Sequence, residues 1–285
     1  MAEILYGGPV ADALNARMAA DCEGLKAKGI VPTLAILRVG EKDADLSYER
    51  GAMKRCDQVG VAVKNVVLPV DVSSDEFFKT LDELNNDPSV HGILMFRPLP
   101  EHIDSEKARC SIAPEKDVDG CTDSSLAGVF TGRELGFPPC TAQAVIEMLK
   151  FYNIDLKSKN VAMVGHSLVV GRPCAAMCTV LDATVDLCQI LTKNTFEHTQ
   201  RADIIIVACG KAGLITPKWI GPNKDQIVID VGINVNAEGK LCGDVAFDEV
   251  EPLVAAISPV PKGVGSVTTS VLVSHVVDAA LRTAR

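Results

Sequence analysis

The chain has 285 residues, of which 47% are hydrophobic and 23% charged, the balance of a folded protein with one large or two ordinary domains. The formal net charge of −9, without a lysine- or arginine-rich stripe, argues against nucleic acid as the main partner. Because no apolar run reaches the roughly 18 residues of a membrane span and no signal peptide is evident, we expect a cytoplasmic protein that does not bind a membrane.

Strands and helices alternate along the first hundred residues. Apolar residues at steps of four predict a helix at 9–28, which Gly29 ends. Strands are predicted at 34–37, 61–68 and 92–96, and helices at 45–58 and 74–85, the latter with Ser74 as its N-cap. Alternation at this spacing indicates βαβ units and a parallel sheet.

The second half repeats the alternation after a long interruption. Residues 101–139 contain many turn formers and few periodic signals, and loops of that length are usually functional. A helix is predicted at 141–151 and a last one at 266–285, with strands at 161–164, 184–187, 204–208, 227–231 and 256–258. We therefore predict a two-domain α/β protein whose N-terminal α/β substrate domain comprises 1–139 with the C-terminal helix 266–285. Residues 140–265 form a Rossmann-type dinucleotide-binding domain, and the ligands are expected in a cleft between the two.

The stretch from Lys159 to Pro173 carries the chemistry of the second domain. A buried strand ends at Gly165, and Gly171 opens an apolar helix. Glycines let the backbone approach a pyrophosphate, and the helix N-terminus offers unpaired N–H groups. The spacing is G-x5-G rather than the common G-x-G-x-x-G, so an ordinary strand-to-helix turn is an equal alternative on this signal alone. Ten scattered cysteines without a C-x-x-C pair predict reduced thiols and no metal site.

Read together, the loops resemble the methylenetetrahydrofolate dehydrogenase/cyclohydrolase family. The matching segments are 39–40 with 47–48, 92–94 with 98–103, 116–120, 139–141, 165–167, 170–173, 202–207, 228–234, 243–245 and 259–261 with 263–265. The resemblance runs from end to end, in the family's order. It implies oxidation of a tetrahydrofolate derivative with NAD or NADP in one-carbon metabolism, commonly followed by hydrolysis, in a homodimer.

The resemblance also implies roles for individual residues. Tyr48 and Asp119 correspond to the family's catalytic residues, which also hold the pterin. The other implied substrate residues are Phe96, Leu99, Pro259, Pro261 and Gly263. The implied cofactor residues are Gly165, His166, Ser167, Gly171, Ile190 and Ile233. Hydride transfer needs orientation and electrostatics from the protein rather than a protein acid.

The chain departs from the family at three positions. The family's lysine, four residues after the tyrosine, is Ala52 here; Phe96 stands where a glutamine would bond that lysine, and Lys262 replaces a glycine. Lys54 lies about 200° further around the helix than position 52, so it should point away. We therefore predict a methylenetetrahydrofolate dehydrogenase whose cyclohydrolase step is weak or absent.

Three other functions stay open. One is the bifunctional enzyme that makes 10-formyltetrahydrofolate, another is a catalytically silent folate-binding subunit, and a third is an unrelated Rossmann dehydrogenase. For the cofactor, Ile190 offers no cation to the 2′-phosphate of NADP, which favours NAD, although the acidic residue typical of NAD sites is missing too.

Overall fold

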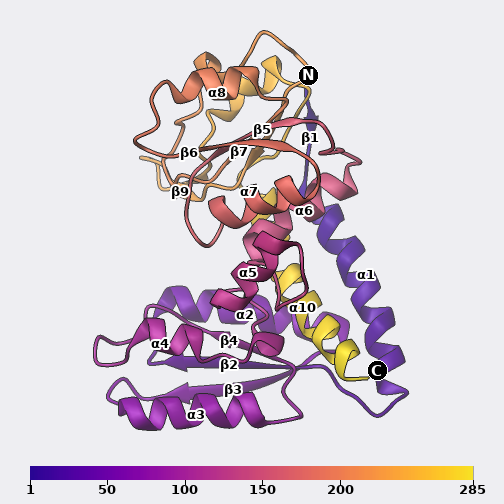
Figure 1. Ribbon diagram of the computed structural model, residues 1–285, viewed down its shortest axis with the longest axis vertical. Helices are drawn as coiled ribbons and strands as arrows, with labels where there is room; N and C mark the ends of the chain where they lie inside the picture. Colours follow the sequence, from indigo (N-terminus) through magenta and orange to yellow (C-terminus); the bar gives the residue numbers. More distant parts are fainter. Residues whose placement is uncertain (285) are drawn as a thin grey trace. The chain divides into compact units, whose positions relative to one another are not determined.

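The computed structural model describes residues 1–284, with the side chain of Ala44 left out. The chain forms two compact units, each around its own parallel sheet (Figure 1). The N-terminal unit comprises residues 12–129, 133–140 and 269–285, and the C-terminal unit comprises 1–11, 130–132 and 141–268. The predicted two-domain α/β fold with parallel sheets is confirmed.

The N-terminal unit is built on a three-stranded sheet of order β3-β2-β4. The central strand β2 (Thr33–Val39) pairs in parallel with β3 (Ala62–Leu68) and β4 (Gly92–Met95). Every residue of β2 after Thr33 is buried because helices α2 (Asp43–Val59) and α3 (Ser74–Asn86) cover opposite faces (Figure 1). The α3 side of the core is filled by Phe77, Leu81 and Leu84.

Two predictions for this unit were wrong in detail. Helix α3 is capped by the hydroxyl of Ser73, which accepts a hydrogen bond from the Glu76 N–H at 3.2 Å, rather than by Ser74. The segment 101–139 holds helices α4 (Ser105–Cys110) and α5 (Asp123–Thr131), which periodicity did not reveal. Gly128 lowers the helix propensity of α5, but a Cβ there would lie 2.8 Å from the Arg133 carbonyl oxygen, so close packing selects glycine.

The C-terminal unit is built on a six-stranded sheet whose strands are all parallel, in the order β1-β11-β8-β7-β5-β6. Their bounds are β1 Glu3–Ile4, β5 Asn160–Val164, β6 Thr184–Cys188, β7 Ile204–Val207, β8 Ile227–Asp230 and β11 Ala256–Ile257. Strand β5 lies between β6 and β7, so the chain reverses its direction of winding there. This is the switch point at which open α/β sheets bind ligands.

The remaining elements are α1 (Gly7–Lys26), α6 (Cys140–Phe151), α7 (Gly171–Val180), α8 (Thr195–Arg201), α9 (Phe247–Val250), α10 (Thr268–Thr283), the antiparallel pair β9 (Asn234–Val235) and β10 (Leu241–Cys242), and 3₁₀ turns at Pro114–Lys116, Pro217–Trp219, Glu251–Leu253 and Val264–Ser266. The elements predicted from periodicity agree with these bounds within two residues, and the predicted end of the last helix at Arg285 lies outside the described residues. Within residues 1–284, no helix is long and apolar enough to cross a membrane.

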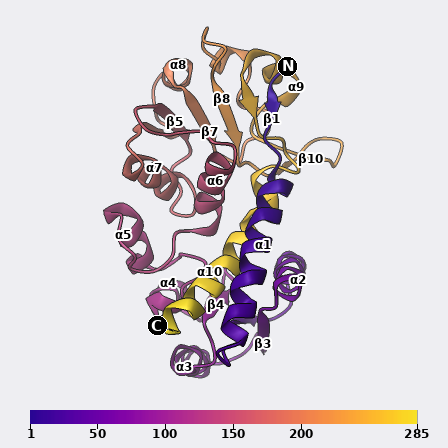
Figure 2. The same cartoon turned by 90° about the vertical axis from the view of Figure 1, so that its right-hand side faces the viewer.

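Each end of the chain belongs to the unit that is formed mainly by the other half of the sequence. Strand β1 pairs with β11 in the large sheet, although the predicted boundaries put residues 1–139 together; those boundaries stay a prediction. In the N-terminal unit, α10 lies beside α1 (Figure 2), where Ser270 Oγ bonds Asn15 at 3.3 Å and Arg17 pairs with Asp278 at 3.7 Å.

Candidate functional site

The turn from β5 to α7 is formed by two glycines in very close backbone contact. Gly165 has φ +127°, and a Cβ on it would overlap the carbonyl oxygen of Ala208 at the end of β7. A Cβ on Gly171 would overlap the carbonyl oxygen of Gly165. Side chains are therefore excluded at both positions, which lets the backbone of the turn lie close to the end of β7.

Hydrogen bonds within the turn fix the residues between these glycines. The Ser167 hydroxyl accepts a hydrogen bond from the Val170 N–H at 3.1 Å, and the Ser167 carbonyl accepts one from the Arg172 N–H at 3.0 Å. No side chain caps the N-terminus of α7 at Val170. The positive end of the helix is thus available to a phosphate, such as the pyrophosphate of a dinucleotide.

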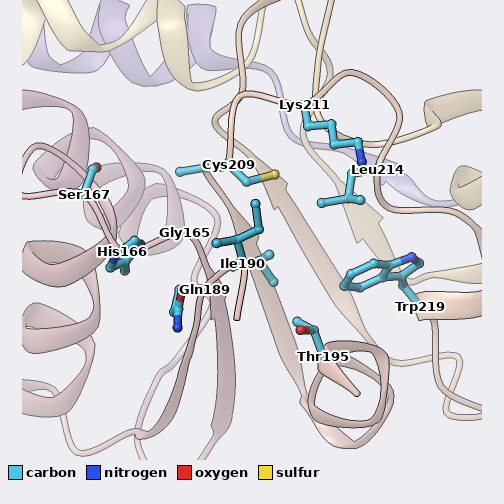
Figure 3. A pocket seen from close by; sticks show the side chains of 12 residues that line it. Gly165, His166, Ser167, Gln189, Ile190, Thr195, Cys209, Lys211, Leu214 and Trp219 are labelled. Carbon is cyan, nitrogen blue, oxygen red and sulfur yellow. The ribbon is translucent and has the colours of Figure 1, made fainter. Parts of the chain in front are cut away.

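A cavity of about 440 Å³ opens beside this turn (Figure 3). Its lining residues are Val164, Gly165, His166, Ser167, Gln189, Ile190, Thr195, Ala208, Cys209, Lys211, Leu214 and Trp219. Four of the six predicted cofactor residues are among them: Gly165, His166, Ser167 and Ile190. Gly171 packs behind the turn, whereas Ile233 is 66% exposed and is not part of the lining.

Several lining residues were not predicted from the sequence. Cys209 and Lys211 follow the buried run of β7, so the rule that ligands bind beyond strand ends could have indicated them. Leu214 and Trp219 come from a turn-rich segment without periodicity. In Figure 3 they lie with Lys211 on the side of the cavity opposite His166 and Ser167.

A second cluster forms in the N-terminal unit around Tyr48 and Phe96. Their rings meet edge to face, with centroids 6.0 Å apart and planes at 85°. Phe96 is fixed directly after β4, because its N–H donates to the Leu37 carbonyl at 3.0 Å. One helical turn after Tyr48, Ala52 is fully buried, whereas Lys54 is exposed. The prediction that Lys54 points away from this face is confirmed.

The loop that carries Asp119 is held by its neighbours on both sides. Val118 offers its carbonyl to His275 Nδ1 at 2.8 Å and to the Cys140 thiol at 3.2 Å. Burial lowers the pKa of His275 to about 4, so the ring is neutral and Nδ1 carries the donated proton. The buried Asp117 carboxylate accepts hydrogen bonds from the Cys121 N–H at 3.0 Å, the Thr122 N–H at 2.7 Å and the Ser125 hydroxyl at 2.6 Å.

Asp119 and Tyr48 have strongly shifted acidities. Burial, with help from the neighbouring Asp117, raises the pKa of Asp119 to about 6, while the nearby Arg97 guanidinium opposes the shift. Burial, followed by the Cys140 and Asp119 charges, raises the pKa of Tyr48 far above its usual range. The Tyr48 hydroxyl therefore stays protonated, and Asp119 is ionised only above about pH 6.

The other predicted substrate residues lie elsewhere. Leu99 is 9% exposed and packs in the hydrophobic core of the N-terminal unit. Pro259, Pro261 and Gly263 form a loop of the C-terminal unit, where a Cβ on Gly263 would overlap the Pro259 carbonyl oxygen. Lys262, in this loop, is exposed and has φ +81°, a conformation that favours glycine.

Metal-binding side chains do not cluster in the described part of the chain, since no group of three His, Cys, Asp or Glu residues there could hold an ion. All ten cysteines are free.

Comparison with known proteins identifies relatives of the whole chain. Residues 5–119 match the catalytic domain of tetrahydrofolate dehydrogenase/cyclohydrolase, and residues 139–284 match its NAD(P)-binding domain. The chain is 47% identical over 279 residues to the bifunctional protein FolD of Alkaliphilus metalliredigens, covering 98% of both. Its structure resembles the FolD enzyme of Campylobacter jejuni with a TM-score of 0.95 at 37% identity, covering 99% of this chain and 100% of that one. It also resembles the Trypanosoma brucei enzyme, solved with NADP and an inhibitor, with a TM-score of 0.90 at 30% identity, covering 100% and 99%.

Gly171→Ala tests the requirement for a bare turn. Overlap of one methyl group in a packed site costs about 1–3 kcal/mol, so the dinucleotide Kd should rise about tenfold to a hundredfold. Gly24→Ala is the control, because a Cβ there meets nothing within 4 Å. Equal dinucleotide affinity in both variants, measured by fluorescence titration, would show that the turn does not contact the ligand.

The acidity of Asp119 predicts the pH dependence of folate binding. If Asp119 holds the pterin, as the resemblance implies, only its ionised carboxylate accepts two hydrogen bonds from the ring, so the KM for the folate substrate should rise as the pH falls through about 6. Arg97→Leu removes a cation that favours ionisation, so the midpoint should move up by roughly one unit. Asp119→Asn should remove the transition altogether. A midpoint that stays in place or falls in Arg97→Leu contradicts this assignment.

Proposed function

The chain belongs to the tetrahydrofolate dehydrogenase/cyclohydrolase family, and from that premise we propose that it oxidises 5,10-methylenetetrahydrofolate to 5,10-methenyltetrahydrofolate with NAD or NADP. One observation carries the proposal: the turn that starts at Gly165 and ends at Gly171, two positions where no side chain fits, opens onto a cavity of about 440 Å³ in the domain that matches the family's NAD(P)-binding model.

On the substrate side, Tyr48 and Asp119 hold the pterin. The Asp119 carboxylate accepts hydrogen bonds from the pterin amino and ring N–H groups, which form a matched pair of donors. The Tyr48 ring packs against the pterin and its protonated hydroxyl is a donor, while Phe96 fixes the ring from the side. Both side chains act by orienting the reacting carbon, which is the main contribution of a protein to hydride transfer.

On the cofactor side, the bound dinucleotide supplies the hydride acceptor. The residues 165–171 hold its pyrophosphate through backbone groups and the N-terminus of α7. The lining residues Leu214 and Trp219 give the cavity an apolar wall, and Lys211 adds one positive charge to it. A subunit that only binds folate has no need of such a cradle, which disfavours the silent-subunit alternative.

The hydrolysis step is where the relatives and the residues of this chain diverge. Relatives named bifunctional favour the alternative prediction, a dehydrogenase that also hydrolyses the methenyl product, and they give no support to loss of that step. At the position of the family's lysine, however, the buried Ala52 offers no amine, and Phe96 occupies the place of the glutamine partner. We therefore keep as a proposal that hydrolysis at this site is slow compared with oxidation. The homodimer implied by the family also stays a prediction.

The choice between NAD and NADP depends on the end of β6. Ile190 is 94% exposed and lines the cavity without offering a charge. The predicted preference for NAD has no support from the relatives, one of which was solved with NADP. We propose that the chain accepts both, because neither the cation typical of NADP sites nor the acid typical of NAD sites is present at this strand end.

A coupled absorbance assay tests the function. With methylenetetrahydrofolate and either dinucleotide, reduced nicotinamide should accumulate while the methenyl chromophore persists, because no amine activates water at position 52. Failure to form reduced nicotinamide would overturn the dehydrogenase. Enzyme-driven decay of methenyl would instead establish the bifunctional alternative.

The double variant Ala52→Lys with Phe96→Gln restores the family's pair of side chains. A positioned acid or base accelerates proton transfer by about a hundredfold or more, so methenyl decay should speed up by that order while oxidation continues. Lys54→Ala is the matched control and should change neither rate, because Lys54 is exposed on the other side of α2. Thermal unfolding of the double variant checks that it still folds.

Ile190→Arg tests whether residue 190 sets the choice between NAD and NADP. A charged hydrogen bond to the 2′-phosphate contributes about 1.5–3 kcal/mol, so kcat/KM for NADP relative to NAD should rise about tenfold to a hundredfold. Leu191→Arg is the control, because Leu191 is next in the chain and 80% exposed but does not line the cavity. An equal effect of both variants would mean that the charge acts only at long range.

A further inference from the structure

Asp244 carries a buried carboxylate that receives hydrogen bonds on every side. It is 0% exposed. Oδ2 accepts from the backbone N–H groups of Cys209 at 2.7 Å and Gly210 at 3.0 Å, and from the Cys209 thiol at 3.2 Å. Oδ1 accepts from the Lys211 N–H at 2.8 Å and the Asn234 side-chain amide at 2.9 Å. Within residues 1–284 no lysine or arginine forms an ion pair with it.

Three successive N–H groups thus converge on one carboxylate from the segment that follows β7. Gly210 adopts φ +66°, which turns the chain so that its neighbours point their N–H groups to the same place. Cys209 and Lys211 are lining residues of the cavity (Figure 3). The position of that wall is therefore set by the carboxylate behind it, because the segment belongs to no helix or strand.

The same carboxylate ties in the segment after β8. It accepts a hydrogen bond from the side chain of Asn234, the residue that follows Ile233. A Cβ on Gly232 would overlap the carboxylate carbon of Asp244, so the backbone at Gly232 passes directly over the carboxylate. Asp244 is itself fixed, since its N–H donates to Asp230 Oδ1 at 3.1 Å. Asp230 also accepts from the N–H groups of Gly232 at 3.0 Å and Val245 at 2.9 Å. Segments 209–211, 230–234 and 243–245 are thus joined by hydrogen bonds to two carboxylates.

We propose that Asp244 is a positioning residue for the dinucleotide: it holds the wall formed by Cys209 and Lys211, and the segment of Ile233, at the spacing that the bound cofactor requires. This rests on the proposed function in that the cavity beside Gly165 is taken as the dinucleotide site. Asp244 does not touch the ligand and acts through the backbone of these two segments.

Asp244→Asn is the sharpest variant, because an asparagine cannot satisfy the site in either orientation. Each oxygen accepts from two N–H groups, so the introduced amide always faces donors. The dinucleotide KM and Kd should rise about tenfold or more, while the folate KM stays within about twofold.

Asp117→Asn is the matched control in the other unit. Its carboxylate is equally buried and also accepts two backbone N–H groups and a hydroxyl, but it holds the loop of Asp119. This variant should raise the folate KM and leave the dinucleotide KM within about twofold. If Asp244 had a merely structural role, Asp244→Asn would lower the Tm but would not raise the dinucleotide KM selectively. That result would overturn the proposal.

The single tryptophan of the chain, Trp219, provides a direct readout because it lines the cavity. Energy transfer from Trp219 to bound NADH or NADPH measures the Kd without turnover. Absence of transfer in the unaltered protein would overturn the assignment of the cavity and with it the proposed function. Transfer in the unaltered protein with the same Kd in Asp244→Asn would overturn only the role of Asp244.

A milder variant covers the case in which Asp244→Asn fails to fold. Asn234→Ala removes one of the donors to Asp244 and leaves the three backbone hydrogen bonds in place. Its dinucleotide Kd should rise by about threefold to tenfold with little change in Tm. An unchanged Kd in Asn234→Ala, with the folded state intact, contradicts the proposal as well.

Discussion

The close approach of the backbone at Gly165 and Gly171 is the constraint on which the rest of the C-terminal unit depends. Helix α7 can start so near the end of β5 only because neither residue carries a side chain. That approach brings the positive end of the helix to the switch point of the sheet, where β6 and β7 pair with opposite edges of β5. The part of the cavity formed by Gly165, His166 and Ser167 follows from this geometry, which also favours an anionic ligand.

Both units fix a functional loop with a buried carboxylate that accepts backbone N–H groups. Asp117 does so beside Asp119, and Asp244 does so beside the cavity. Loops without regular structure would otherwise leave their N–H groups unpaired or flexible, and a carboxylate satisfies several at once. Precise positioning is what a hydride-transfer site requires of its protein, so this is an economical way to hold irregular chain in one place.

Features that depend on local periodicity and glycine spacing could be predicted from the sequence. Features that depend on tertiary packing could not. The strands, the turn at Gly165 and the direction of Lys54 away from position 52 were accessible, because apolar runs and helical angles are local properties. Helix α5 was not predicted because Gly128 lowers its helix propensity. Strand β1 was not predicted because two residues are too few to show the alternation of a strand. Trp219 and Leu214 reach the cavity only through the fold. The resemblance to the family supplied Tyr48 and Asp119, whose roles no composition or spacing indicates by itself.

The central claim is that a reduced folate lies against Tyr48 and Asp119 while a dinucleotide lies on the turn from Gly165 to Gly171. A crystal structure of the protein with a folate analogue and a dinucleotide measures both at once. The account predicts the pterin amino group within hydrogen-bonding distance of Asp119 and the pyrophosphate against the N-terminus of α7. A pterin away from Asp119, or a pyrophosphate away from this turn, would contradict it.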